Sequence, residues 1–235
     1  MIYRLTPLFF FFLSIFSDGT AIQLHSNAIA AKTEMKVESK ALTVYNQLNA
    51  NHLSIPNLES FTNALEGFYD LKAKGLVSRD ILTLIDFSMS SNQKRLWVID
   101  LTTNTILYNT LVAHGRNTGD EFAKTFSNAA ESYKSSLGFY ATGSIYNGKH
   151  GASLYLNGLE KGVNDNARNR SVVMHGADYV SESFIKNNHR LGRSLGCPAI
   201  PVEMTAAIIN AIKDKSCLYI YHPCRCKKPT VNMIS

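Results

Sequence analysis

One cysteine in the chain has neighbours that suit catalysis. Cys197 lies in the run from Gly192 to Pro198, directly after a glycine, and His175 follows the apolar residues 171–174. A cysteine attacks as the thiolate, and a nearby imidazole can accept its proton and return it to a leaving amine. The pair therefore predicts acyl transfer, although a buried small cysteine and a hydrogen-bonded structural histidine fit the spacing as well.

Glycine and proline flank this cysteine on its two sides. Gly196 leaves the backbone bare, so the N–H groups of Gly196 and Cys197 are candidates to bind a developing oxyanion. Pro198 has no N–H and restricts the chain just beyond the cysteine. These features predict a fixed loop that presents the thiol.

Short strands are expected to position the pair. Residues 81–87 and 95–101 read as strands, the second joined to 105–108 as a hairpin, and 111–114 as a continuation. Residues 115–136 read as a long surface excursion. The remaining predicted elements are strands at 138–144, 152–156, 171–175 and 217–221 and a helix at 204–213.

Helical periodicity precedes the strands. Helices are expected within 32–51 and from Leu58 to Leu71, the second closed by Gly75. The fold class is therefore mainly β with helical additions (α+β). We divide the chain into an N-terminal helical packing segment, 32–80, a catalytic domain, 81–223, and a basic tail, 224–235.

The N-terminus has the pattern of a secretory signal peptide. Arg4 precedes a short apolar run, 8–16, and small residues follow it. A membrane anchor or a buried strand is the alternative, but the run is shorter than the ~20 residues of a spanning helix. We predict a signal peptide over 1–21, with cleavage as late as residue 30, no membrane span in the mature protein, and a periplasmic or secreted location.

Composition sets wider limits. The 235 residues are 45% hydrophobic and 18% charged, which suits a single globular domain. The net charge of +6 favours polyanionic surroundings, but no zinc-finger spacing or aromatic-basic motif accompanies it. We therefore expect no nucleic-acid partner, and we expect a monomer.

Three further cysteines lie near the C-terminus. Cys224 and Cys226 are too close in sequence for an easy mutual disulfide, so a link from Cys217 to one of them and a loose tail both stay open. A metal site that also uses His222 is a weaker alternative, because the spacing fits no common zinc pattern. We predict no metal and no cofactor.

Residues 95–223 resemble a known catalytic domain. Matching blocks occur in order at 94–101, 135–143, 158–167, 175–177 and 192–199. Together they resemble the L,D-transpeptidase (YkuD-like) family, and within it the murein L,D-transpeptidase subgroup whose motif reads Gly-Arg-Ser-x-Gly-Cys-Pro-Ala. The chain departs from the wider family at Leu195, where a second histidine is usual, and in a longer segment between His175 and Ser194.

The resemblance implies roles for the catalytic residues and a mixed β-sheet or sandwich fold. Cys197 would be the nucleophile, His175 its base and acid, and the carbonyl of Gly176 would orient the imidazole. Ser194 would brace the loop. The amides of Leu195, Gly196 and Cys197 would form the oxyanion hole.

The resemblance also suggests substrate contacts. Arg193, with Arg190 and His189, would bind substrate carboxylates, unless these residues form only a solvated basic loop. Leu195 lines the site. Tyr140, Tyr146 and His150 would line the acyl-donor groove, for which ordinary packing is the alternative. Residues 164–166 would shape a lid, and a calcium site there is conceivable.

The implied activity is modification of bacterial peptidoglycan. Cys197 would attack a stem tetrapeptide between its third residue and the terminal D-alanine, and a second stem peptide's amine would resolve the thioester as a 3→3 cross-link. In the first alternative water is the acceptor, which makes a carboxypeptidase or an amidase. The second alternative is a non-catalytic wall-binding module.

Overall fold

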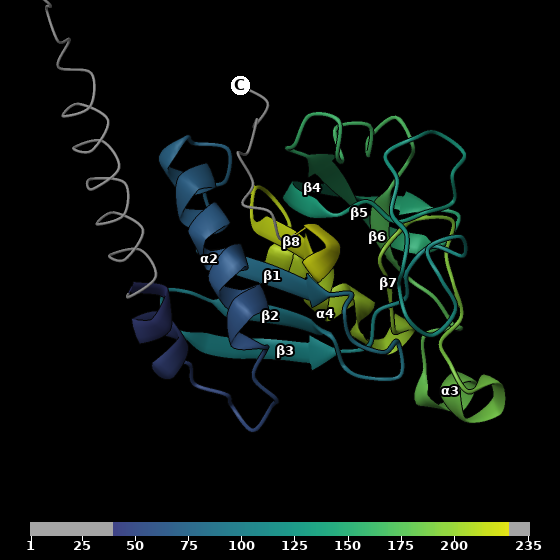
Figure 1. Ribbon diagram of the computed structural model, residues 1–235, viewed down its shortest axis with the longest axis horizontal. Coiled ribbons are helices and arrows are strands. Elements are labelled where there is room, and N and C mark those ends of the chain that lie inside the picture. The colour runs from purple at the N-terminus through teal and green to yellow at the C-terminus, as the bar shows by residue number, and fades with distance from the viewer. Residues whose placement is uncertain (1–39, 226–235) are drawn as a thin grey trace, which may run out of the picture. The chain divides into compact units, whose positions relative to one another are not determined.

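The computed structural model describes residues 40–225. The predicted signal peptide, both predicted cleavage positions, residues 32–39 and the tail beyond Arg225 lie outside the described residues. Within them, eight strands form one sheet in the order β3-β2-β1-β8-β4-β5-β6-β7 (Figure 1). The mainly β fold with helical additions is confirmed.

The strands and helices fall close to the predicted elements. The strands are β1 (Ile81–Asp86), β2 (Leu96–Asp100), β3 (Thr105–Thr110), β4 (Gly138–Gly148), β5 (Gly151–Gly158), β6 (Val173–Gly176), β7 (Ala199–Ile200) and β8 (Cys217–Tyr221). The helices are α2 (Leu58–Ala73), α3 (Glu182–Asn188) and α4 (Val202–Ile212), with helical residues at 40–46 and a 3-10 helix, η1, at Pro223–Arg225.

The last strand lies in the middle of the sheet. β8 pairs in parallel with β1, Leu84 opposite Tyr219, and antiparallel with β4, Tyr140 opposite Leu218. β6 and β7 form the second parallel pair, and the remaining neighbours are antiparallel. The sheet is therefore mixed, as predicted.

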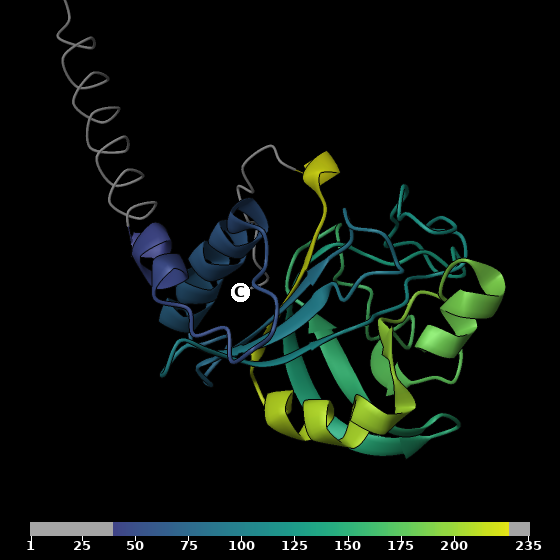
Figure 2. The same cartoon turned by 90° about the horizontal axis from the view of Figure 1, so that it is seen from below.

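Both faces of the central strands are buried. Leu82, Leu84 and Trp97 pack with the apolar side of α2, whereas Ile85 and Val98 share a core with α4. Figure 2 shows α2 and α4 on opposite faces of the sheet. Because strand side chains alternate between faces, burial on both faces requires nearly continuous apolar runs, which is what 81–87 and 96–99 contain.

Local sequence explains where α2 begins and ends. The side chain of Asn57 accepts a hydrogen bond from the Glu59 amide at 2.9 Å, which caps the first turn. The chain then leaves the helix through Gly75, whose φ of +70° suits glycine. Since α2 shares a core with β1 and β8, the boundary placed at residue 80 separates helix from sheet within one compact unit.

Two predictions about elements were wrong. Residues 111–114 are not a strand; Ala113 makes an isolated bridge to Ala199, and the next bridge, from Gly115 to Ser194, is isolated too. Helix α3 was not predicted, and none of its residues is buried, so it carries no apolar period to recognise. No helix in residues 40–225 is long and apolar enough to cross a membrane.

Candidate active site

Parallel pairing of β6 with β7 brings the predicted pair together. His175 lies opposite Ala199, so the chain two residues earlier brings Cys197 beside Val173. The Val173 amide donates to the Cys197 Sγ at 3.5 Å, and the thiol lies 3.7 Å from the Ser171 carbonyl oxygen. Residues two apart on a strand face the same side, so His175 and Cys197 occupy one face of the sheet.

The imidazole of His175 is oriented by its own backbone. Its Nδ1–H donates to the Gly176 carbonyl oxygen at 2.9 Å, which leaves Nε2 as the basic nitrogen. The contact expected from the sequence is therefore present. Burial lowers the pKa of His175; the Gly176 hydrogen bond opposes this, and His150 and Lys149 add to it.

The thiol is a partly exposed, free cysteine with a raised pKa. Burial of the sulfur is the main cause; the Val173 amide, the charges of Arg170 and Lys149 and its own N–H act in the opposite direction. With the thiol pKa raised and the imidazole pKa lowered, the resting pair is neutral. Proton transfer to His175 must then accompany substrate binding or attack.

Ser194 holds the loop before the cysteine in shape. Its hydroxyl donates to the Cys197 carbonyl oxygen at 2.6 Å and accepts from the Gly196 amide at 3.0 Å. Gly196 has φ of +127°, a conformation that disfavours any side chain. The bracing expected of Ser194 is present, but the Gly196 N–H points at Ser194 rather than at a substrate, which corrects the predicted three-amide oxyanion hole.

A second backbone segment holds the other side of this loop. The Ser194 amide donates to the His114 carbonyl oxygen at 3.0 Å, and the Arg116 amide donates to the Ser194 carbonyl oxygen at 2.8 Å. Gly115 lies so close that a Cβ there would be 3.0 Å from the Gly196 Cα. The nucleophile loop is therefore hydrogen-bonded to residues 113–116.

The fully buried Arg95 supports residues 112–114, next to this segment. It donates to the carbonyl oxygens of Val112, at 3.0 and 3.2 Å, and Met89, at 2.7 Å, and to the Nδ1 of His114 at 2.8 Å. Burial lowers the pKa of Arg95 to about 9. Burial and the Arg95 charge lower the pKa of His114 to about 4. His114 is therefore a neutral connector between the arginine and the loop.

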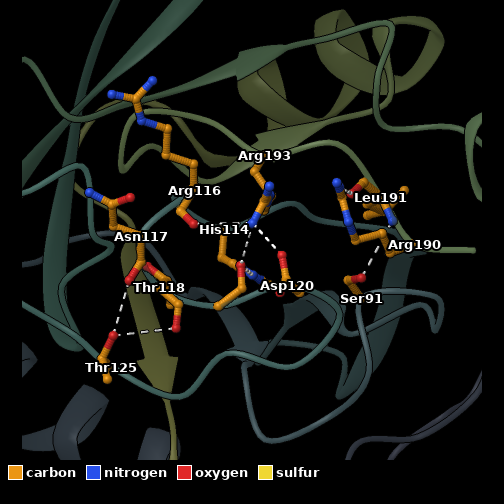
Figure 3. A network of polar contacts seen from close by, with 11 residues as sticks. Ser91, His114, Arg116, Asn117, Thr118, Asp120, Thr125, Arg190, Leu191 and Arg193 are labelled. Atoms are coloured by element: carbon orange, nitrogen blue, oxygen red, sulfur yellow. Dashed lines mark hydrogen bonds and ion pairs between the residues drawn. The ribbon is translucent and has the colours of Figure 1, made fainter. Parts of the chain in front are cut away.

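Arg193 belongs to the same network and not to an open substrate site. Its Nη1 contacts Asp120 Oδ1 at 2.6 Å and the carbonyl oxygen of Gly119 at 3.2 Å (Figure 3). Arg190 donates to the Leu191 carbonyl oxygen at 2.8 Å. In this structure the charge of Arg193 has an acidic partner, Asp120, and its carboxylate-binding role stays a prediction.

Other predicted contacts also lie elsewhere. Tyr140 is completely buried in the core, and its hydroxyl donates to the Ser136 carbonyl oxygen at 3.0 Å, so it does not line a groove. The side chain of Asn164 is buried and donates to the carbonyl oxygens of Leu137 and Phe139, both at 2.9 Å, so it fastens its loop to the start of β4. For Tyr140 the structure therefore supports ordinary packing, the alternative to a groove contact. A polar group alone does not reveal whether its partner is protein or ligand.

Two residues near the thiol escaped the sequence analysis. Arg170 donates to the oxygens of Ser127, Ser132, Lys134 and Ser136 and exerts a favourable electrostatic effect on the thiolate of Cys197. Burial and the charge of Cys197 raise the pKa of Tyr179 to about 12. No spacing pattern marks either residue, since their partners lie tens of positions away.

Strands β4 and β5 continue the face of the sheet that carries the catalytic pair. Ser153 and Tyr155 pair with His175 and Val173, and Tyr146 pairs with Ser153, so these side chains share the face of the catalytic pair. Tyr146 stacks on Tyr155 at 4.3 Å between ring centroids.

The turn between these two strands reaches the catalytic histidine. The ring of His150 stacks on His175 at 4.4 Å. Leu195 is 55% exposed beside the thiol. Tyr146, His150 and Leu195 therefore stay candidates for substrate contact.

The other cysteines lie apart from the site. Cys217 is fully buried in β8, and burial raises its thiol pKa, whereas Cys224 is exposed in η1. Among the described residues no group of three His, Cys, Asp or Glu side chains could hold a metal ion. Cys226 lies outside the described residues.

Comparisons with known proteins point to one family. A family model for the L,D-transpeptidase catalytic domain matches residues 52–221, which includes α2 and the whole sheet. A search of curated proteins gives no match.

Solved structures give matches of low identity. An L,D-transpeptidase from Mycobacterium smegmatis is 9% identical, with a TM-score of 0.37, over 61% of this chain and 59% of that one. An L,D-transpeptidase solved in complex with imipenem is 10% identical, with a TM-score of 0.37, over 60% and 59%. The helical cell shape determining protein Pgp2 from Campylobacter jejuni is 13% identical, with a TM-score of 0.38, over 65% and 55%. The chain thus spans 50–62% of the length of these and five further solved structures.

Proposed function

Because this chain belongs to the L,D-transpeptidase catalytic-domain family, we propose that it is an exported acyltransferase that cross-links peptidoglycan stem peptides through Cys197. The observation that carries the proposal is the β6–β7 pairing, which sets the thiol beside Val173 and the imidazole of His175 two residues further along the same face. Family membership alone gives peptidoglycan modification; the residue roles, the acceptor and export are the proposal.

The first half-reaction forms a thioester. His175 Nε2 accepts the thiol proton as Cys197 Sγ attacks the carbonyl carbon that joins the third stem residue to the terminal D-alanine. The amides of Leu195 and Cys197 are the remaining candidates to stabilise the oxyanion, since the Gly196 amide is bonded to Ser194. The C–N bond then breaks, and the proton on Nε2 passes to the departing D-alanine amine.

The second half-reaction transfers the acyl group. A side-chain amine of another stem peptide attacks the thioester and gives its proton to His175, the C–S bond breaks, and the thiolate recovers that proton. The product is a 3→3 cross-link. Water in place of the amine would give the shortened stem peptide, so the acceptor decides between transferase and hydrolase.

Product analysis tests both the chemistry and the acceptor. Purified protein is incubated with tetrapeptide-containing wall fragments, and the products are identified by mass spectrometry. Cross-linked dimers support transfer, shortened monomers alone support the hydrolase, and no product from wild type overturns the proposal. Cys197→Ala and His175→Ala should abolish product, whereas Cys224→Ser, a cysteine outside the site, should leave it unchanged.

Acylation by a carbapenem gives an independent test of the nucleophile. One relative was solved in complex with imipenem, and we propose that the same compound acylates this chain at Cys197. Intact-mass measurement should show one adduct in wild type and in Cys224→Ser, and none in Cys197→Ser. An adduct that persists in Cys197→Ser would place the nucleophile elsewhere.

A further inference from the structure

We propose that Lys149, at the turn between β4 and β5, binds the terminal carboxylate of the acyl donor. The inference rests on the proposed function, because it assigns a substrate contact to the same site. It assigns to Lys149 the carboxylate-binding role that was expected of Arg193, because the structure pairs Arg193 with Asp120.

The position of the turn is fixed by two observations. Gly148 pairs with Gly151 at the end of the hairpin, so Lys149 and His150 are its two central residues. The ring of His150 stacks on that of His175 with an angle of 18° between the rings. The residue next to His150 therefore lies at the rim of the catalytic pair.

The charge of Lys149 reaches both catalytic groups. It contributes to lowering the pKa of His175 and also acts to lower that of Cys197. This agrees with the position of the turn, which places Lys149 next to the ring that stacks on His175. Lys149 is exposed and forms no ion pair with any residue between 40 and 225. Its positive charge is therefore available to a ligand.

The other nearby cations are already engaged. Arg170 donates to four oxygens of residues 127–136, and Arg193 pairs with Asp120. The guanidinium of Arg168 lies 3.4 Å from the centre of the Tyr155 ring. Unlike these three arginines, Lys149 has no hydrogen bond, ion pair or aromatic partner among the described residues.

The substrate's own geometry requires such a cation. In a donor that loses one terminal residue, three covalent bonds separate the attacked carbonyl carbon from the carboxylate carbon, which limits their separation to about 4 Å. A carboxylate so close to a reacting thiolate is repelled unless a positive charge lies nearby. Lys149 supplies that charge, which selects donors that end one residue after the attacked bond.

The test compares a stem tetrapeptide with a free terminal carboxylate and the same peptide as a terminal carboxamide. Turnover is measured with wild type, Lys149→Met and Lys149→Arg, and binding is measured by calorimetry in the Cys197→Ser background. Lys161→Met is the matched control, because Lys161 is also exposed but follows the opposite end of β5.

We expect Lys149→Met to raise KM and weaken binding about tenfold for the free acid, through the loss of one charge-assisted hydrogen bond. Because Lys149 also acts on the pKa of His175 and Cys197, a change in kcat should be equal for the two donors, and binding of the carboxamide should be unaffected. Lys149→Arg should keep the wild-type preference, and Lys161→Met should match wild type. The Arg168→Gln variant tests whether the neighbouring guanidinium is the source of the preference for the free acid.

The outcomes separate this inference from the proposed function. Three results would overturn the role of Lys149 while turnover continues. They are an equal loss of binding for acid and amide in Lys149→Met, an unchanged preference for the acid in that variant, or a preference for the acid that is lost only in Arg168→Gln. Carboxylate-dependent binding that needs Lys149 in a protein without turnover would support the inference and reject the enzymatic proposal. Absence of tetrapeptide binding would reject both.

Discussion

The nucleophile loop lies between two surroundings of opposite character. Toward residues 113–116 it meets a buried network in which Arg95, His114 and Arg193 all have protein partners. On the side of the β4–β5 turn, Lys149 and His150 are exposed, and the ring of His150 stacks on His175.

The two sides differ in what their charges contact. On the side toward residues 113–116, which we call the closed side, each cation bonds to backbone or to a carboxylate. Its contribution is to hold Ser194 and Gly196 in place. On the side of the β4–β5 turn, Lys149 is exposed and has no ion-pair partner among the described residues. The arginines of the closed side therefore position the nucleophile loop, whereas in our proposal Lys149 binds the substrate.

The largest effect expected on the closed side comes from Ser194→Ala. The change removes the hydroxyl that links the Gly196 amide to the Cys197 carbonyl oxygen. We expect kcat/KM to fall about 100-fold, because small displacements of a catalytic group have effects of that order. Ser183→Ala, an exposed serine on α3, is the control, and activity of Ser194→Ala within threefold of wild type would contradict a bracing role.

Arg95→Met tests whether the closed side is a structural support. Two backbone carbonyls lose their donor, so we expect the free energy of unfolding to fall by about 2–3 kcal/mol in urea titrations. The exposed neighbour Lys94→Met should change it by less than about 0.5 kcal/mol. Unchanged or increased stability would mean that the burial of the charge outweighs its hydrogen bonds.

Arg170→Gln tests the electrostatic link to the thiol. Removal of the cation raises the pKa of Cys197, so less thiolate exists at a given pH below that pKa. Alkylation by iodoacetamide at pH 8 should slow by about threefold to tenfold, and its pH profile should shift to higher pH. Arg170→Lys keeps the charge and should restore the profile; if it does not, the hydrogen bonds of Arg170 matter more than its charge.

The smallest effect is expected from Arg193→Gln. Its partner Asp120 is largely exposed, so the ion pair should contribute less than about 1 kcal/mol to stability. KM for the free-acid tetrapeptide should stay within twofold of wild type. A KM increase as large as that of Lys149→Met would return the carboxylate-binding role to Arg193.

Features with a local signal in the sequence were predicted best. Apolar runs located β1, β2 and β8 to within a residue or two, because burial on both faces leaves an uninterrupted pattern. The pairing of Cys197 with His175 followed from a short motif and an ordered set of blocks. Helix α3 and strand β7 are too short and too little patterned to be predicted in this way.

Contacts made across the fold were not predictable. Tyr140 was expected at a groove and is in the core, while Arg170 lies near the thiol with no signal in its neighbours. Arg193 was assigned from its position in the motif, but its acidic partner is 73 residues away. Whether a polar side chain faces protein or solvent depends on such distant partners, which one sequence does not reveal.

The central place of β8 has a consequence for how the chain is completed during synthesis. β1 emerges early, yet its parallel neighbour is formed by Cys217–Tyr221, near the end of the chain. Until those residues are available, β1 and β4 each have an unpaired edge, and the sheet consists of two separate pieces. Pairing between strands so far apart in sequence is slow compared with local pairing. The incomplete chain therefore passes through a stage in which the two pieces of the sheet are separate, until β8 pairs with both.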